Sequence, residues 1–134
     1  MQFSTGAHCV YNLKAHLIFV VAYRRKAISS RILQRLMEIF SDVSQREQSE
    51  LLECSGEREH VHRLILHPPK LCLSELIRKL KAISSLKIRR EFNSEIRHLL
   101  WGKRFWTKSY CVISVGDGAT TEIIEQYIRN QRPN

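Results

Sequence analysis

The sequence predicts an α+β fold in which one antiparallel sheet carries helices on one face. Segments of strand character alternate with segments of helical periodicity in the order β-α-β-β-α-β-α. The chain of 134 residues has room for a single domain, residues 1–134. Its 43% hydrophobic and 26% charged content is typical of a soluble packed domain. This order is that of a ferredoxin-like sandwich, here followed by an additional C-terminal helix.

The first half of the chain supplies three expected strands and one helix. Residues 10–23 end in a β-branched and aromatic run without Gly or Pro, which favours a buried strand. A helix is expected from Ser29 or Ser30 to about residue 45, because its apolar residues recur at helical spacing after a serine that can act as N-cap. Two antiparallel strands are expected at 51–54 and 59–67, on either side of a turn.

The second half supplies a basic helix, a strand and a final helix. Residues 74–92 show helical periodicity, and the faces away from the apolar stripe are strongly basic. A strand is expected at 109–115, ended by Gly-Asp-Gly. The last helix should begin at Thr120 or Thr121, and Pro133 should end it.

The charge of the chain favours a polyanionic partner. Lys and Arg total 22 against 13 acidic residues, which gives a formal charge of +9. Nucleic acid is the first such partner, although a solvated basic surface or an anionic membrane surface fits the charge as well. The longest apolar run, 17–22, is too short to span a bilayer, so we expect a cytoplasmic protein with no membrane association. Its four scattered cysteines should be reduced thiols.

His60 and His62 form a candidate metal site. One residue separates them within a predicted strand, so both imidazoles should project from the same face. The alternative is a pair of hydrogen-bonded histidines at a sheet surface, because this spacing also arises by chance.

Tyr127 and Gln131 form a second candidate pair on the last predicted helix. Their spacing of four places a phenol and an amide one turn apart on one face. A phenol can act as a covalent nucleophile, and an amide oxygen can ligate a hard cation such as magnesium. The alternative is an aromatic ring packed on the core beside an exposed amide.

Several separated motifs together resemble the TnpA-type single-tyrosine transposases of small bacterial and archaeal insertion sequences, members of the HUH endonuclease superfamily. The resemblance covers nearly the whole chain, and the order and spacing of the motifs make it specific. The motifs are His60-Val61-His62, Leu80-Lys81-Ala82-Ile83-Ser84-Ser85, Phe105-Trp106 with Ser109-Tyr110, and Tyr127-Ile128-Arg129-Asn130-Gln131.

The resemblance implies a role for each residue of the two pairs. Tyr127 corresponds to the nucleophile, His60 and His62 to metal ligands, and Gln131 to a third ligand of Mg²⁺ or Mn²⁺. In the family's reaction the tyrosine cuts single-stranded DNA at hairpin-bearing ends, keeps a 5′-phosphotyrosine link and releases a 3′-hydroxyl. Family members act as homodimers in which the tyrosine helix of one subunit can complete the metal site of the other.

Three positions depart from the usual family pattern. Arg63 stands where an aliphatic residue is typical, on the strand face opposite the histidines, and a charge there is costly if it is buried without a partner. Ala82 replaces a frequent glycine, and Glu59 precedes the histidine motif where aspartate is common. These last two changes look tolerable.

Basic and aromatic residues supply candidate DNA contacts. Basic side chains neutralise phosphates, and aromatic rings can stack on unpaired bases, although such rings more often belong to a core or an interface. The candidates are Arg78, Lys79, Lys81, Lys87, Arg89, Arg90, Lys103, Arg104 and Trp106, with Trp101 and Phe105 as further rings.

Two other functions fit the same sequence. A domesticated relative would bind DNA or RNA hairpins without moving a mobile element, but four intact candidate site residues argue against a dead site. A ferredoxin-like RNA-binding or regulatory module would carry the two histidines by coincidence, and its binding would be unaffected by metal.

Overall fold

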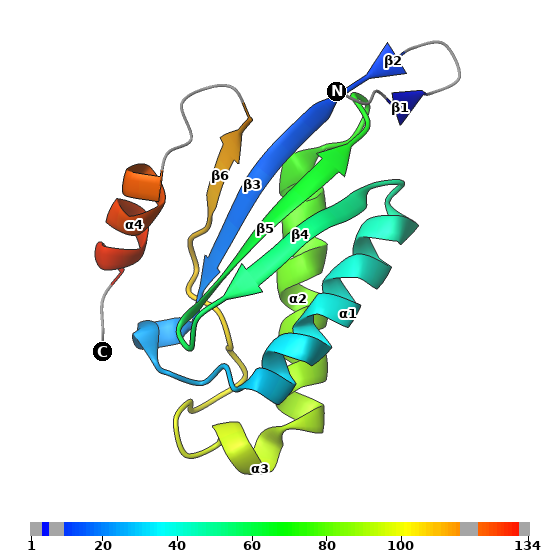
Figure 1. Cartoon of the computed structure of the whole chain (residues 1–134). Coiled ribbons are helices and arrows are strands. Elements are labelled where there is room, and N and C mark those ends of the chain that lie inside the picture. Colours follow the sequence, from blue (N-terminus) through cyan, green and yellow to red (C-terminus); the bar gives the residue numbers. More distant parts are fainter. Residues whose placement is uncertain (1–3, 6–9, 116–120, 132–134) are drawn as a thin grey trace.

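The computed structural model describes residues 4–5, 10–115 and 121–131. Four strands, β3 (Leu13–Val20), β4 (Glu50–Gly56), β5 (His60–His67) and β6 (Cys111–Ser114), form an antiparallel sheet in the order β4-β5-β3-β6 (Figure 1). The first and third of these strands occupy the centre, which is the ferredoxin-like arrangement. The predicted α+β fold class is confirmed. A separate two-stranded ribbon, β1 (Ser4–Thr5) and β2 (Val10–Tyr11), was not predicted.

Two long helices cover one face of the sheet and make the main core. They are α1 (Ser30–Arg46) and α2 (Leu73–Glu91), and α2 is followed by the short α3 (Asn93–Ile96). The hydroxyl of Ser29 accepts a hydrogen bond from the backbone of Ile32 at 3.2 Å, so the predicted N-cap is present. None of the described helices is both long enough and apolar enough to cross a membrane.

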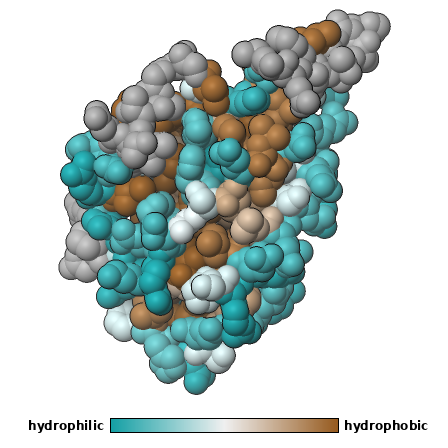
Figure 2. Space-filling view, viewed as in Figure 1, coloured by the Kyte–Doolittle hydropathy of each residue, from teal (hydrophilic) through white to brown (hydrophobic). Residues whose placement is uncertain are grey.

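The other face of the sheet is more open. Helix α4 (Thr121–Arg129) lies beside β6 in Figure 1, and its Ile128 packs against Ile18 and Val20 in a small second cluster. Viewed from the same side, apolar residues stay visible over the strands while hydrophilic residues cover the flanking surfaces (Figure 2). This partly covered face is the one on which the candidate site lies.

The first strand is shorter than predicted because the chain turns sharply after it. Strand β3 ends at Val20, and a 3₁₀ turn, η1 (Ala22–Arg24), replaces the expected continuation to residue 23. Tyr23 and Arg24 have φ angles of 59° and 54°, a left-handed backbone that no strand can include. The predicted Gly-Asp-Gly stop and Pro133 itself lie outside the described residues, but the prediction that the last helix continues to Pro133 was wrong, because α4 ends at Arg129.

Gly56 is the last residue of β4, just before the turn that leads into the histidine strand. A Cβ at this position would lie 2.9 Å from the carbonyl oxygen of His60. The backbone N–H of Glu57 donates to that same oxygen at 3.0 Å, so the two strands approach too closely for a side chain. The glycine therefore fixes where β5 begins, and with it the position of His60.

Arg63 is fully buried between two aromatic rings of the core. Its Cζ lies 3.6 Å from the ring centroid of Phe19 and 4.3 Å from that of Phe40. None of its three nitrogens has a hydrogen-bond partner among the described residues. Burial lowers the pKa of Arg63 to about 9, so the guanidinium is still charged at neutral pH. The two ring faces offset part of the expected cost of burying this charge.

We expect Arg63→Met to stabilise the fold by about 1–4 kcal/mol. Desolvation of an unpaired cation costs several kcal/mol, more than the roughly 2 kcal/mol that a desolvated cation–π contact returns. Met keeps the length of the side chain and can pack its sulfur against both rings. Urea unfolding measures the change, and Arg90→Met, at an exposed position of α2, is the matched control with an expected change within about 0.5 kcal/mol. A loss of stability in Arg63→Met would contradict this account of the core.

Candidate active site

His60 and His62 share the open face of β5. Along this strand, half-buried His60 and His62 alternate with fully buried Val61 and Arg63, which face the helices. His60 is paired with Val20 and His62 with Ile18 of the neighbouring central strand. The two imidazoles therefore project on the same side, as their spacing predicts.

A third histidine, His16, lies against this pair. Its Nδ1 is 2.7 Å from Nε2 of His62, and the two rings stack with centroids 4.9 Å apart. The register brings them together diagonally, since His16 pairs with Leu64 on β5. Sequence reasoning missed His16, because the alternation of β3 gives its face but not the strand register that places it beside His62.

The surroundings keep both histidines of the pair neutral. Burial lowers the pKa of His60, although the nearby carboxylates of Glu59 and Glu57 oppose this effect. Burial also lowers the pKa of His62, and electrostatic interactions with His16 and Arg63 lower it further. A neutral imidazole has a lone pair that can bind a metal, although Nε2 of His62 already lies at hydrogen-bond distance from His16.

The donors present fit a divalent cation, but the described chain does not complete a site by itself. His60 Nδ1 is buried without a hydrogen-bond partner among the described residues, which leaves a lone pair unused. No group of three or more His, Cys, Asp or Glu side chains within the described ranges is arranged to hold a metal ion. A further ligand would have to come from another residue type, such as an amide, or from a bound molecule.

A cavity of about 550 Å³ opens over the histidine pair. Its wall includes three residues of α4, so the last helix borders the site. Arg24 reaches into it from the η1 turn and lies 3.6 Å from the carboxylate of Glu59. The lining residues are Arg24, Ser55, Glu57, Glu59, His60, His62, Glu125, Ile128 and Arg129.

Tyr127 and Gln131 lie together, but they are not among the residues lining this cavity. The Tyr127 hydroxyl is 2.8 Å from the hydroxyl of Ser109, which in turn donates to Oε1 of Gln131 at 3.1 Å. Glu125, Ile128 and Arg129 form a different face of α4, the one that borders the histidines. The structure thus joins the two members of each predicted pair, and the phenol is hydrogen-bonded to Ser109 and does not line the cavity over the histidines.

Ser109 fixes the direction of hydrogen bonding around the phenol. A hydroxyl has one proton, and Ser109 donates it to Gln131, so the Tyr127 hydroxyl must be the donor to Ser109. Burial raises the pKa of the Tyr127 phenol. The phenol is therefore protonated in this arrangement. Ser109 belongs to one of the motifs that carry the family resemblance, but the sequence did not predict its hydrogen bond with Tyr127.

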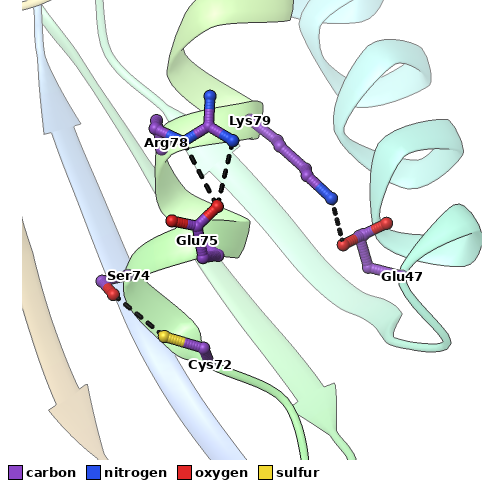
Figure 3. Close-up of polar contacts among 6 residues, drawn as sticks. All are labelled: Glu47, Cys72, Ser74, Glu75, Arg78 and Lys79. Carbon is purple, nitrogen blue, oxygen red and sulfur yellow. Dashed lines mark hydrogen bonds and ion pairs between the residues drawn. The ribbon is translucent and has the colours of Figure 1, made fainter.

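Several of the predicted phosphate contacts already have partners within the chain. Arg78 forms an ion pair with Glu75 at 3.0 Å, and Lys79 forms one with Glu47 at 2.7 Å. Both pairs are drawn in Figure 3. Lys81 donates to three consecutive backbone carbonyls, of residues 107–109, with a shortest distance of 2.6 Å. Arg89 donates to the carbonyls of Leu100 and Gly102.

The other predicted DNA contacts range from exposed to fully buried. Arg90, Lys103 and Arg104 are exposed, and Lys87 is half-buried. Trp106 is 2% exposed, and its Nε1–H donates to Ser84 at 2.9 Å, so its ring belongs to the core and is not available to stack on a base. Phe105 is buried beside it.

The basic residues also surround a cavity of about 320 Å³ between α2 and the segment before β6. Four cationic side chains contribute to its wall, which suits an anionic ligand. They are Arg78, Lys81, Arg104 and Lys108.

Comparison with known proteins assigns the family. Residues 9–131 match the family model described as "Transposase IS200 like". The chain belongs to the IS200-like transposase family. The match includes the histidine pair, Tyr127 and Gln131 within one continuous segment.

Individual relatives agree with this family. The chain is 28% identical to the ISDra2 transposase TnpA of Deinococcus radiodurans, over 98% of this chain and 92% of the relative. It is 30% identical to the transposase for insertion sequence element IS200 of Salmonella typhimurium, over 93% of this chain and 80% of the relative. Each of these proteins matches this IS200-like transposase along most of its length.

Solved structures support the fold. A crystal structure of a transposase from Deinococcus radiodurans R1 has a TM-score of 0.87 at 28% identity, covering 98% of this chain and 99% of that one. The structure of a REP-associated tyrosine transposase, bound to a REP hairpin, has a TM-score of 0.57 at 13% identity. The match covers 95% of this chain and 70% of that one. The second likeness is evidence for the fold alone.

Proposed function

We propose that this IS200-like transposase is a metal-dependent enzyme that cuts and rejoins single-stranded DNA through a covalent link to Tyr127. The observation that carries the proposal is the pair of neutral histidines, His60 and His62, beneath a cavity bordered by the helix of Tyr127. Its substrate would be DNA with hairpins at the ends of an insertion sequence. The proposed cofactor is Mg²⁺ or Mn²⁺.

In the proposed reaction, the phenolic oxygen of Tyr127 attacks a DNA phosphorus atom. The bond from phosphorus to the 3′ oxygen breaks, the phenol loses its proton to solvent, and the leaving oxygen takes up a proton from solvent to become a 3′-hydroxyl. The 5′-phosphotyrosine link preserves a phosphodiester, so a different 3′-hydroxyl can reverse the step without an external energy source. A divalent ion held by His60, His62 and Gln131 would neutralise charge on the phosphate.

The resting geometry implies that α4 moves before the reaction. Oε1 of Gln131, the atom proposed to ligate the ion, now accepts the proton of Ser109, and the Tyr127 hydroxyl donates to the same serine. Both contacts must break for the phenol and amide to reach a histidine pair. A homodimer would let α4 reach the histidines of a partner chain, and two chains would supply two nucleophiles for two DNA ends.

A domesticated, hairpin-binding relative remains the second candidate function. Such a relative would use the same basic cavity between α2 and the segment before β6, because binding a phosphate does not require a catalytic reaction. Cleavage separates the two functions.

We expect the protein to cut a hairpin-bearing single strand and to leave the same sequence uncut as a perfect duplex. The test uses DNA copied from the regions flanking the coding sequence, with Mg²⁺, and a single strand of scrambled sequence as control. Binding should weaken steeply as salt rises, because phosphate contacts release counterions. Equal cutting of single strand and duplex would contradict the proposal, and hairpin binding without any cutting would favour the domesticated relative.

A further inference from the structure

The turn that follows β3 separates two cavities. Tyr23 and Arg24 both have left-handed backbone angles, which cost roughly 1 kcal/mol or more for each such residue. Backbone hydrogen bonds hold the turn, from Arg24 to Val21 at 2.8 Å and from Ala22 to Phe105 at 2.9 Å. As a result Arg24 lines the histidine cavity, whereas Tyr23 and Arg25 line a second cavity.

The second cavity is lined by an aromatic ring, that of Trp101, which is not buried in the core. It measures about 290 Å³ and is lined by Tyr23, Arg25, His98, Leu99 and Trp101. Trp101 is 87% exposed and Tyr23 is 48% exposed. A large apolar ring that gains so little from burial is typical of a surface that meets a partner.

The backbone around Trp101 is held in place from both sides. Arg89 donates to the carbonyl of Leu100, at 3.2 Å, and to that of Gly102. Leu100 itself is buried, and Gly102 adopts a φ of 74° that permits the sharp turn after Trp101. The exposed indole is therefore presented by an anchored segment, which lowers the entropy lost when a ligand binds.

The lining chemistry points to a flat, anionic ligand. Two aromatic rings supply stacking faces, Arg25 supplies a permanent positive charge, and no carboxylate is among the described residues that line the cavity. The volume is at the small end of ligand sites, which suits one unit of a polymer. A nucleobase with its phosphate meets these requirements.

We propose that this cavity binds an unpaired nucleobase, stacked on Trp101 and Tyr23, with Arg25 on its phosphate. This inference rests on the proposed function, because it assigns the base to a single DNA strand that continues over the η1 turn to the histidine cavity. Arg24 and Arg25, adjacent in the chain but in different cavities, mark the two ends of that path. The site would position the strand next to the proposed point of cutting.

The two tryptophans make the test direct. Trp101 is exposed and Trp106 is buried, so a quencher that stacks at the surface should reach only Trp101. The probes are oligodeoxythymidylate, oligodeoxyadenylate and an abasic strand with the same number of phosphates, all with a metal chelator present. We expect the two base-bearing strands to quench tryptophan fluorescence and the abasic strand to leave it unchanged.

Variants then assign the effect to the cavity. Trp101→Ala and Tyr23→Ala should each weaken binding of the base-bearing strands by about 5- to 150-fold, the equivalent of one lost stacking contact. Trp101→Phe should stay within a few-fold of the wild type and lose the fluorescence change. Leu86→Ala, an exposed apolar position on α2, is the control that should change nothing.

Three results would overturn the proposal: quenching by the abasic strand as strong as by the others, wild-type binding in Trp101→Ala, or a fluorescence change that survives in Trp101→Phe. If Trp101→Ala instead abolished self-association and left strand binding intact, the surface would be a protein interface. Because the chelator prevents metal-dependent cutting, binding is measured independently of catalysis. Failure of this site and failure of the proposed function are therefore distinguishable.

Discussion

Tyr127→Phe is expected to fold, to bind DNA as the wild type does, and to lose cleavage by about a thousandfold or more. The ring is half-buried against the second apolar cluster, with Ile128 next to it in the chain, and phenylalanine preserves that packing. Only the oxygen that would attack phosphorus is removed, together with its hydrogen bond to Ser109. Single-turnover cleavage and adduct formation measure the loss, and both should disappear together.

The matched control for this variant is Tyr110→Phe. Tyr110 is the residue next to Ser109 in the chain, is 39% exposed, and has no role in the proposed reaction. Its cleavage rate should stay close to that of the wild type. Equal cleavage by Tyr127→Phe and the wild type would remove the nucleophile from the proposed mechanism.

The second large effect is expected at the histidine pair. His60→Ala or His62→Ala should reduce metal-dependent cleavage by at least about a hundredfold, while binding of hairpin DNA without metal stays largely intact. His67→Ala is the control, because it lies at the far end of the same strand. Calorimetric titration with Mn²⁺ should show weaker binding only in the first two variants. Full cleavage by wild-type protein in excess chelator would contradict the metal assignment.

The pH dependence of this reaction follows from the same histidines. Burial lowers the pKa of both His60 and His62 below the ordinary value of 6.5, so their neutral forms persist to more acidic pH than in a free peptide. Protons compete with the metal only below these lowered values. The acid limb of the cleavage profile should therefore lie below pH 6.5 at saturating metal.

Much of this architecture was predictable because it depends on local periodicity. The alternation of β5 was sufficient to place His60 and His62 on one face. Helical periodicity also placed Tyr127 on the last helix, but α4 ends at Arg129, so the prediction that Gln131 lies on the same helix was wrong. The N-cap of α1 was equally local, since Ser29 needs only the backbone of Ile32. Each of these features follows from residues close together in the sequence.

What could not be predicted depends on contacts between distant segments. Strand register brings His16 to His62, and tertiary packing brings Ser109 to Tyr127. Trp106 was predicted to contact DNA, but its ring fills the core beside Phe19 instead. The sequence predicted that burying Arg63 would be costly. It did not predict that Arg63 lies between the rings of Phe19 and Phe40, because that arrangement depends on the packing of α1 on the sheet.

The central claim is that Tyr127 becomes covalently attached to DNA. The most direct measurement incubates the protein with a hairpin-bearing single strand and Mg²⁺, digests the adduct with protease and nuclease, and identifies the modified peptide by mass spectrometry. We predict that the nucleotide remnant lies on the peptide containing Tyr127. A remnant on a peptide containing Tyr11, Tyr23 or Tyr110, or efficient cutting with no covalent adduct, would contradict the account.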